Sequence, residues 1–169
     1  LLRDLGSACS PDNAFAIIQG LETVALRMKQ HCENAQKVVE YLKKHKEITR
    51  VIYSTEHDKP IADRAKKYLK GGNGPMVGIE LKGGIEAGKK FIESLKMFYH
   101  VANIGDARSL AIHPASTTHS QLNKQELAAS GVTQSYVRLC IGLEHIDDII
   151  DDLDQALNKS SKETLKAVS

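Results

Sequence analysis

The residues from 136 to 141 limit the possible folds most strongly, because one arginine stands in an otherwise apolar run. The run reads Tyr-Val-Arg-Leu-Cys-Ile and favours a β-strand, with Arg138 near its middle. An unpaired guanidinium in such a run is unfavourable, so Arg138 needs an anion. Its planar, five-donor group suits bidentate binding of a carboxylate. That carboxylate could belong to the chain itself or to a ligand.

The chain has the size and composition of one soluble globular domain. Its 169 residues are 41% hydrophobic and 26% charged, which is enough apolar material for a real core. It begins at Leu1 without an initiator Met, which suggests that residues 1–169 are a single domain of a longer protein.

The charge and cysteine content argue against several kinds of site. The net charge is +2, no tryptophan is present and 5% of the residues are aromatic, so we expect no nucleic-acid partner. Cys9, Cys32 and Cys140 are widely spaced and form no CxxC, which favours a reducing, cytoplasmic compartment over a disulfide framework or a thiolate zinc site. No apolar run reaches 18 residues, so we expect no membrane segment.

Hydrophobic periodicity predicts two helices near the start of the chain. Ser10 and Pro11 suit the N-cap and first turn of a helix over about 11–28. Its apolar stripe consists of Ala14, Ile17, Ile18, Leu21, Val24, Ala25 and Met28. A second helix is predicted over about 33–44.

The rest of the chain alternates strands with helices. We predict strands over 48–53, 76–81, 99–102, 110–112 and 136–141, and helices over 61–69, 85–96 and from about 144 onward. Asn123 and Glu126 have the spacing of a capping box, and Gly131 ends that short helix. The glycine-rich residues 71–75 lack the ending of a phosphate-binding P-loop and are predicted to be a turn. These elements predict an α/β domain with one sheet covered by helices.

Two patches resemble a known family. They are residues 103–119, with the sequence NIGDARSLAIHPASTTH, and residues 136–144, with the sequence YVRLCIGLE. The patches and their order are similar to the C-terminal domain of the pyridoxal 5'-phosphate (PLP) enzymes of cysteine and methionine metabolism. Residues 2–34 and 104–121 resemble most the O-acetylhomoserine sulfhydrylase branch. The resemblance implies the small C-terminal domain of fold type I PLP transferases, a largely antiparallel sheet covered by helices.

The resemblance implies a substrate-binding role for three residues. Arg138 matches the arginine that binds the substrate α-carboxylate in the family's Arg-Leu-Ser-Val-Gly-Leu-Glu pattern, which here has Cys140 and Ile141 in its middle. A buried arginine paired with a carboxylate of the domain is the alternative. Asn103 stands where lyases of the family have a serine, and is either near the same carboxylate or a turn residue. Thr118 either lines this pocket or bonds the loop backbone.

The histidines do not form a recognisable metal site. His113 and His119 are six residues apart, which does not match a pattern such as HExxH. Both are expected to be core or loop residues whose nitrogens are hydrogen-bonded. We therefore expect no metal-binding residue within this chain. The resemblance implies that the catalytic and cofactor-binding residues also lie outside it.

The resemblance also implies what the longer protein does. Such an enzyme holds PLP as a Schiff base on a lysine, and no lysine here sits in the family's motif for it. We therefore expect an N-terminal PLP domain outside this chain, a homotetramer, and no activity of the chain alone. The implied reaction replaces the γ-acetate of O-acetyl-L-homoserine by sulfide or a thiol, giving homocysteine or methionine. Cystathionine γ-synthase or methionine γ-lyase chemistry, and a non-catalytic carboxylate- or protein-binding module, are the alternatives.

Overall fold

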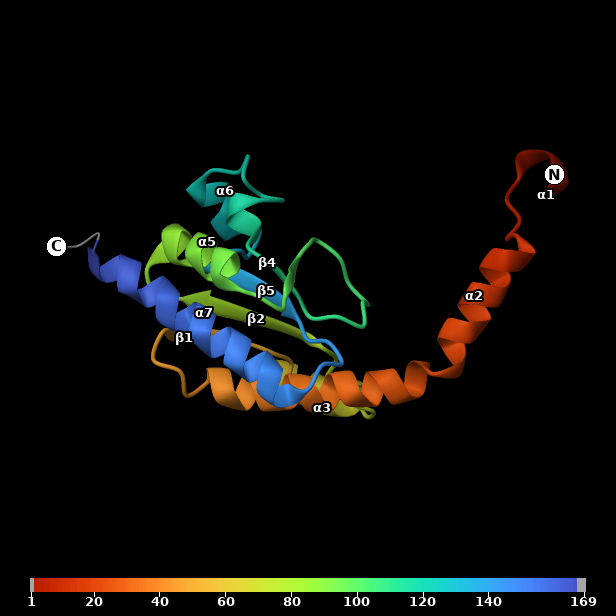
Figure 1. Cartoon of the computed structure of the whole chain (residues 1–169), viewed down its shortest axis with the longest axis horizontal. Coiled ribbons are helices and arrows are strands. Elements are labelled where there is room, and N and C mark those ends of the chain that lie inside the picture. Colours follow the sequence, from red (N-terminus) through yellow and green to blue (C-terminus); the bar gives the residue numbers. More distant parts are fainter. Residues whose placement is uncertain (1, 167–169) are drawn as a thin grey trace.

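The computed structural model describes residues 2–166, which form a sheet with helices on one face and a helical arm that projects from it (Figure 1). In chain order the elements are α1 (Leu2–Leu5), α2 (Pro11–Glu22), α3 (Val24–Leu42), β1 (Ile48–Ile52), α4 (Lys59–Tyr68), β2 (Met76–Leu81), α5 (Gly84–Ser94), β3 (Tyr99–His100), β4 (Leu110–Ile112), the 3-10 helix η1 (Pro114–Ser116), α6 (Lys124–Ala129), β5 (Tyr136–Cys140) and α7 (Ile146–Lys166).

The sheet has five strands in the order β1-β2-β5-β4-β3. All neighbouring strands are antiparallel except β3 and β4, which confirms the predicted α/β domain with a largely antiparallel sheet. The central strand is β5, and its Arg138 stands in register between Gly78 of β2 and Ile112 of β4. The arginine singled out in the sequence therefore lies in the middle of the sheet.

Helices α3, α5 and α7 cover one face of this sheet (Figure 1). Val137 and Leu139 of β5 belong to the same buried cluster as Ile149 and Leu153 of α7, and burial of this apolar layer drives folding. Successive side chains of a strand point to opposite faces. Arg138 consequently points away from the layer of α3, α5 and α7.

The boundary between the first two long helices differs from the prediction. The helix predicted over 11–28 ends before Thr23, which has φ −110° and ψ 5°, and α3 then continues as one helix to Leu42. The predicted helix start near 33 is therefore wrong. Periodicity placed a break there because His31 and Asn34, both polar, occupy the buried face of α3.

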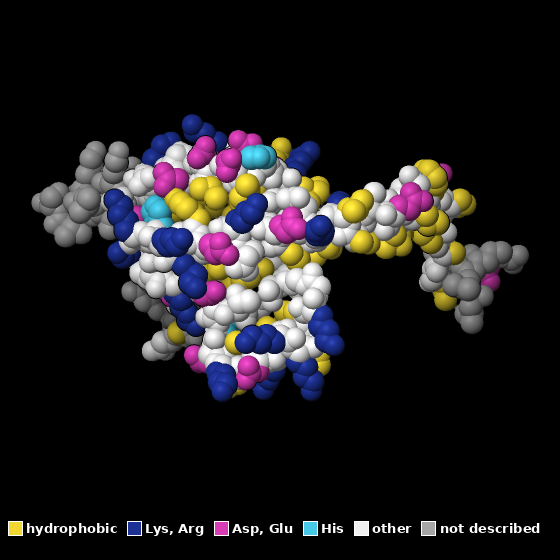
Figure 2. Space-filling model, turned by 90° about the horizontal axis from the view of Figure 1, so that it is seen from below, with side chains coloured by type: hydrophobic (Ala, Val, Ile, Leu, Met, Phe, Trp, Pro, Cys, Tyr) yellow, Lys and Arg dark blue, Asp and Glu magenta, His cyan; other side chains and the backbone are white. Residues whose placement is uncertain are grey.

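The apolar stripe of α2 has no partner within the described residues. Phe15 is 64% exposed and Leu21 is 60% exposed, and no residue of α2 is buried. Figure 2 shows hydrophobic side chains along this projecting arm. Helical spacing predicted the start and the apolar side of this helix, and within the described residues no other element buries that side.

Local signals at the helix ends are confirmed. Ser10 Oγ accepts a hydrogen bond from Asn13 N at 3.2 Å. Both bonds of the capping box are present, because Asn123 Oδ1 accepts from Glu126 N and Glu126 Oε2 accepts from Asn123 N. The strands over 76–81 and 110–112 are as predicted. Apart from the first two helices, the other predicted strands and helices differ by one or two residues at some ends. Within residues 2–166, none of the helices is long and apolar enough to span a membrane.

Candidate functional site

Arg138 has an incompletely satisfied guanidinium. Its Nη2 donates a hydrogen bond of 3.1 Å to the main-chain oxygen of Asn103. Its Nε is buried and has no hydrogen-bond partner, and no described carboxylate forms an ion pair with the group. Since the sequence left open whether the chain or a ligand supplies the anion, the geometry favours a ligand.

A groove of about 360 Å³ runs beside Arg138 on this face of the sheet. Besides Arg138 it is lined by Ile52, Tyr53, Ser54, His57, Ile61, Asn73, Met76, Val77, Gly78 and Tyr136. These described lining residues include no aspartate, glutamate or lysine. The positive charge of Arg138 is therefore not neutralised in the groove, which suits a small anion.

Asn103 meets Arg138 through its main chain. Its carbonyl oxygen accepts from Arg138 Nη2 and lies 3.8 Å from Cys140 Sγ, whereas its side-chain oxygen accepts from Ile104 N at 2.9 Å. The structure thus brings together two of the predicted site residues. The contact uses the carbonyl group, which every residue type has.

Thr118 lies apart from this pair. It follows η1, is exposed, and its hydroxyl lies 2.9 Å from His119 Nδ1, with which it shares a hydrogen bond. It is not among the described residues that line the groove beside Arg138. Contact between Thr118 and a substrate remains a prediction.

His113 is a fully buried core residue. Its Nδ1 lies 2.8 Å from Ser116 Oγ, and its Nε2 lies 2.8 Å from the main-chain oxygen of Gln134. Burial lowers the pKa of this imidazole, which favours the neutral form. A Cβ at Gly88 would come within 2.6 Å of His113 Cδ2, so the glycine gives the ring its space. These contacts confirm a core histidine with both nitrogens hydrogen-bonded.

Tyr136 is a groove residue that the sequence analysis did not select. A Cβ at Gly78 would lie 2.7 Å from Tyr136 Cε2, which shows that the ring packs on the main chain of β2. Burial raises the pKa of the Tyr136 hydroxyl, and the neighbouring charge of Arg138 partly offsets this. A neutral phenol therefore stands two residues from the guanidinium on the same face. Gly78, which lies opposite Arg138 in β2, was the feature of the sequence that could have indicated space for this ring.

His31 and Asn34 were also missed, and they hold the end of β5. The Nδ1 of His31 lies 2.7 Å from the oxygen of Ile141, and Asn34 Nδ2 donates to the oxygens of Gly142 and Glu144 at 3.0 Å each. Both side chains are buried and come from α3. Polar residues at helical spacing on a buried face were the signal for such a contact.

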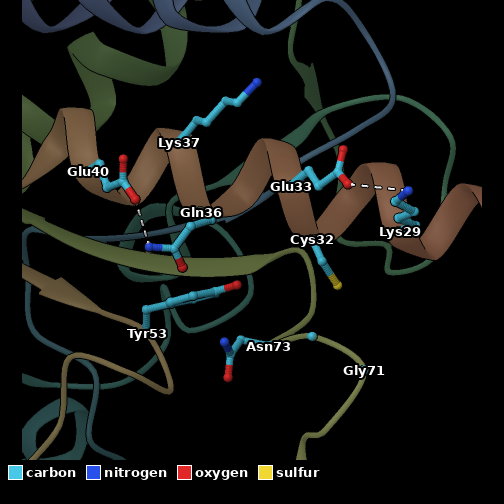
Figure 3. A pocket seen from close by; sticks show the side chains of 10 residues that line it. Lys29, Cys32, Glu33, Gln36, Lys37, Glu40, Tyr53, Gly71 and Asn73 are labelled. Atoms are coloured by element: carbon cyan, nitrogen blue, oxygen red, sulfur yellow. Dashed lines mark hydrogen bonds and ion pairs between the residues drawn. The ribbon is translucent and has the colours of Figure 1, made fainter.

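A second cavity, of about 930 Å³, lies between α3 and the turn at residues 71–73 (Figure 3). Among its polar groups, Lys29 and Glu33 form an ion pair at 3.9 Å, and the amide of Gln36 donates to Glu40 at 3.0 Å. The turn leads directly into β2 rather than into a helix N-terminus. This confirms a turn between two elements at residues 71–75.

Comparison with known proteins identifies the family. A family model described as Cys/Met metabolism PLP-dependent enzyme matches residues 1–158. The chain belongs to this family. It is 55% identical over 157 residues to the O-acetyl-L-homoserine sulfhydrylase of Leptospira meyeri, covering 92% of this chain and 36% of that protein. It is 46% identical over 159 residues to an L-methionine gamma-lyase of Fusobacterium nucleatum, covering 94% of this chain and 40% of the relative.

Solved structures of the family have the same fold. A structure described as an O-acetylhomoserine (thiol)-lyase of Campylobacter jejuni, containing pyridoxyl-lysine phosphate, aligns with a TM-score of 0.83 and 43% identity over 93% of this chain and 37% of its own. A cystathionine gamma synthase of Xanthomonas oryzae aligns with a TM-score of 0.83 and 33% identity, over 94% of this chain and 41% of its own. The chain thus spans little more than a third of the length of these relatives.

The described residues fit one side of a PLP site. The groove beside Arg138 offers a cation to an anionic ligand, but no lysine that could hold the cofactor. None of the described residues is therefore assigned to PLP itself. What the described residues offer is a groove with one cationic group, Arg138, that suits a small anion.

Proposed function

We propose that this chain is the C-terminal, substrate-binding domain of a PLP-dependent O-acetylhomoserine sulfhydrylase. The enzyme replaces the γ-acetate of O-acetyl-L-homoserine by sulfide or a thiol, giving homocysteine or methionine. The observation that carries the proposal is the guanidinium of Arg138, which lies in a groove without carboxylates and has an unsatisfied Nε. The similarity to sulfhydrylases of Leptospira meyeri and Corynebacterium glutamicum supports this substrate class.

Arg138 binds and orients the substrate. A bidentate bond between its guanidinium and the α-carboxylate, with Asn103 holding the same guanidinium by its carbonyl, fixes the position of the α-carbon. Fixing that carbon directs its C–H bond toward the base that removes the proton. PLP, when bound, supplies the electron-withdrawing group that makes this proton acidic. Asn103 and Thr118 complete the proposed substrate-binding set.

The exposed apolar stripe of α2 is evidence that a second domain packs on this helix. Phe15, Ile18 and Leu21 are each more than half exposed, and contiguous apolar surface of this kind marks an interaction site (Figure 2). We assign the N-terminal PLP domain, the bearer of the lysine, as the partner of this surface. The whole enzyme is proposed to be a homotetramer. The free thiols of Cys9, Cys32 and Cys140 support a reducing, cytoplasmic location.

Substitution of Arg138 in the longer enzyme tests the proposal. For Arg138→Ala we expect kcat/KM for O-acetyl-L-homoserine to fall by roughly 100-fold or more, as for loss of a desolvated charge pair, with PLP absorbance retained. Arg50→Ala is the matched control, because Arg50 lies on the edge strand β1 with its side chain 59% exposed. Equal activity of the two variants would refute the assignment of Arg138.

Two related activities are the alternatives within the family. The similarity to an L-methionine gamma-lyase supports elimination as one alternative reaction. The similarity to a cystathionine gamma synthase supports replacement by cysteine as the other. Comparing sulfide, methanethiol and cysteine as acceptors in the longer enzyme separates them. A carboxylate-binding module without catalysis is the alternative from another class, and PLP that fails to co-purify with the longer protein would favour it.

A further inference from the structure

The carboxylate of Glu144 joins the segment that follows β5 to the segment that precedes β4. Its Oε1 accepts from Ser109 N at 2.7 Å and its Oε2 accepts from Ser109 Oγ at 2.9 Å. Ser109 Oγ in turn accepts from Gly142 N at 2.8 Å, and Leu143 N donates to the oxygen of Ala107 at 2.8 Å. We call this network of residues 107–109 and 142–144 the Glu144 clamp.

The clamp is tightly packed. Ser109 is fully buried, and its main-chain nitrogen and its hydroxyl both donate to Glu144. A Cβ at Gly142 would clash with Glu144 Oε2 and with Ser109 N, and would lie 2.6 Å from Arg108 C. A side chain at position 142 therefore cannot be accommodated unless the two segments move apart. The glycine is needed for this close approach.

The clamp secures one end of the loop that holds Arg138. Residues 101–108 are all exposed and form the open loop drawn in green beside β5 (Figure 1). Inside the loop, Asn103 Oδ1 and Asp106 Oδ1 bond near neighbours in sequence, Ile104 N and Arg108 N. Two main-chain oxygens connect this loop to β5 and to the residues after it. The Asn103 carbonyl contacts Arg138 and Cys140, and the Ala107 carbonyl accepts from Leu143 N within the Glu144 clamp.

We propose that Glu144 is a positioning residue for the substrate carboxylate, acting through Ser109 and the Asn103 loop on Arg138. This inference rests on the proposed function, since it assumes that Arg138 binds the α-carboxylate. With the carboxylate of Glu144 in place, the loop is fixed where the Asn103 carbonyl orients the guanidinium. Without it, Ser109 N and Oγ lose their acceptors, the loop loosens, and the guanidinium no longer points into the groove.

A pair of ligands that differ in one group tests the proposal in the PLP-loaded longer enzyme. The binding of L-methionine and of 3-(methylthio)propylamine, the same molecule without its carboxylate, is measured from the change in cofactor absorbance. For Glu144→Ala we expect methionine to bind about tenfold more weakly, as for loss of one charge-assisted hydrogen bond, and the amine to bind as in the wild type. Equal weakening of both ligands, or of neither, would overturn the proposal.

Conservative and control variants keep the test decisive. Glu144→Gln keeps an acceptor oxygen for Ser109 N, but it puts an amide donor where the hydroxyl of Ser109 now donates to a carboxylate oxygen. Methionine binding should therefore be partly restored. Glu86→Ala removes an exposed glutamate that pairs with Lys89 and should change neither ligand. If Glu144→Ala fails to fold, Ser109→Ala replaces it, because it removes the hydroxyl link with no change of charge.

Two further measurements separate this inference from the proposed function. Arg138→Ala should weaken methionine binding but not amine binding; if it weakens neither, the proposed function fails. If Arg138→Ala behaves as expected and Glu144→Ala does not, only the positioning role fails. Hydrogen exchange of residues 101–108 in the cofactor-free longer protein gives a readout that needs no PLP. Glu144→Ala should speed this exchange, and unchanged exchange would overturn the proposal.

Discussion

The hydroxyl of Tyr41 in α3 donates a 2.6 Å hydrogen bond to the carboxylate of Asp154 in α7. Asn158 donates to the other oxygen of the same carboxylate, and the ring of His45 packs at 5.8 Å from that of Tyr41. The two helices that cover the sheet are thus joined by a polar contact at the edge of the core. Burial and this carboxylate raise the pKa of the Tyr41 hydroxyl, which stays protonated.

Removal of the Tyr41 hydroxyl should destabilise the domain without altering its shape. We expect Tyr41→Phe to lower the free energy of unfolding by about 1.5 kcal/mol, the usual size for a hydrogen bond to a charged group. Urea denaturation of the wild type and the variant measures this difference. Tyr68→Phe is the control, because Tyr68 is 69% exposed and its hydroxyl should contribute little. Equal stability of both variants would show that the bond to Asp154 is not stabilising.

The stability of the domain should depend on the protonation of His113. Burial lowers the pKa of His113 below its ordinary value of 6.5, so between the two values the unfolded chain binds more protons than the folded one. This contribution to stability is complete above pH 6.5 and is lost as the pH falls toward the lowered pKa. We expect a smaller free energy of unfolding at about pH 5.5 than at about pH 7.5.

Substitution of His113 measures its share of this dependence, because burial lowers the pKa of His45 as well. For His113→Gln we expect the free energy of unfolding to depend less on pH than in the wild type. An NMR titration of the wild type measures the same property directly. A His113 signal that titrates at or above 6.5 would contradict the expectation.

Sequence reasoning could select the residue of the candidate site whose signal is local, and it missed the contacts that depend on residues distant in the chain. Arg138 was found because a charge inside an apolar β-forming run is visible in six residues, and the strand itself lies within one residue of the prediction. The partner carbonyl of Asn103 could not be derived, because main-chain oxygens are the same in every residue. The family resemblance, rather than the chemistry of asparagine, brought Asn103 to notice.

The helices also show this difference between local signals, which the sequence reveals, and contacts between residues distant in the chain, which it does not. α7 was predicted well because Ile149, Leu153 and Leu157 repeat at helical spacing and are all buried. In α3 the buried positions include His31 and Asn34, whose partners are oxygens about 110 residues away in the chain. Periodicity treats such polar residues as a break in the stripe. Their role follows only from the end of β5, which the two side chains hold.

The carboxylate of Asp152 should be essential for the connection between α5 and β3. It is buried in α7 and accepts hydrogen bonds from the main-chain nitrogens of Lys96, Met97 and Phe98, at 2.8 Å for Met97. Asp152→Ala leaves these donors without an acceptor, and we expect a loss of about 3 kcal/mol in the free energy of unfolding. Thermal denaturation measures it. The neighbouring Asp151 is exposed, so Asp151→Ala should be close to neutral, and similar losses for both would rule out this role.

Gly142→Ala should separate the two segments of the Glu144 clamp. The added methyl group would overlap Glu144 Oε2 and Ser109 N, and neither can retreat without breaking its hydrogen bonds. We expect a loss of about 2 kcal/mol or more in the free energy of unfolding, the usual result of overpacking a buried site. Gly71→Ala is the matched control, because a Cβ at Gly71 meets nothing within 4 Å. If urea denaturation gave the same small change for both variants, the segments would be free to move apart, and glycine would not be required at position 142.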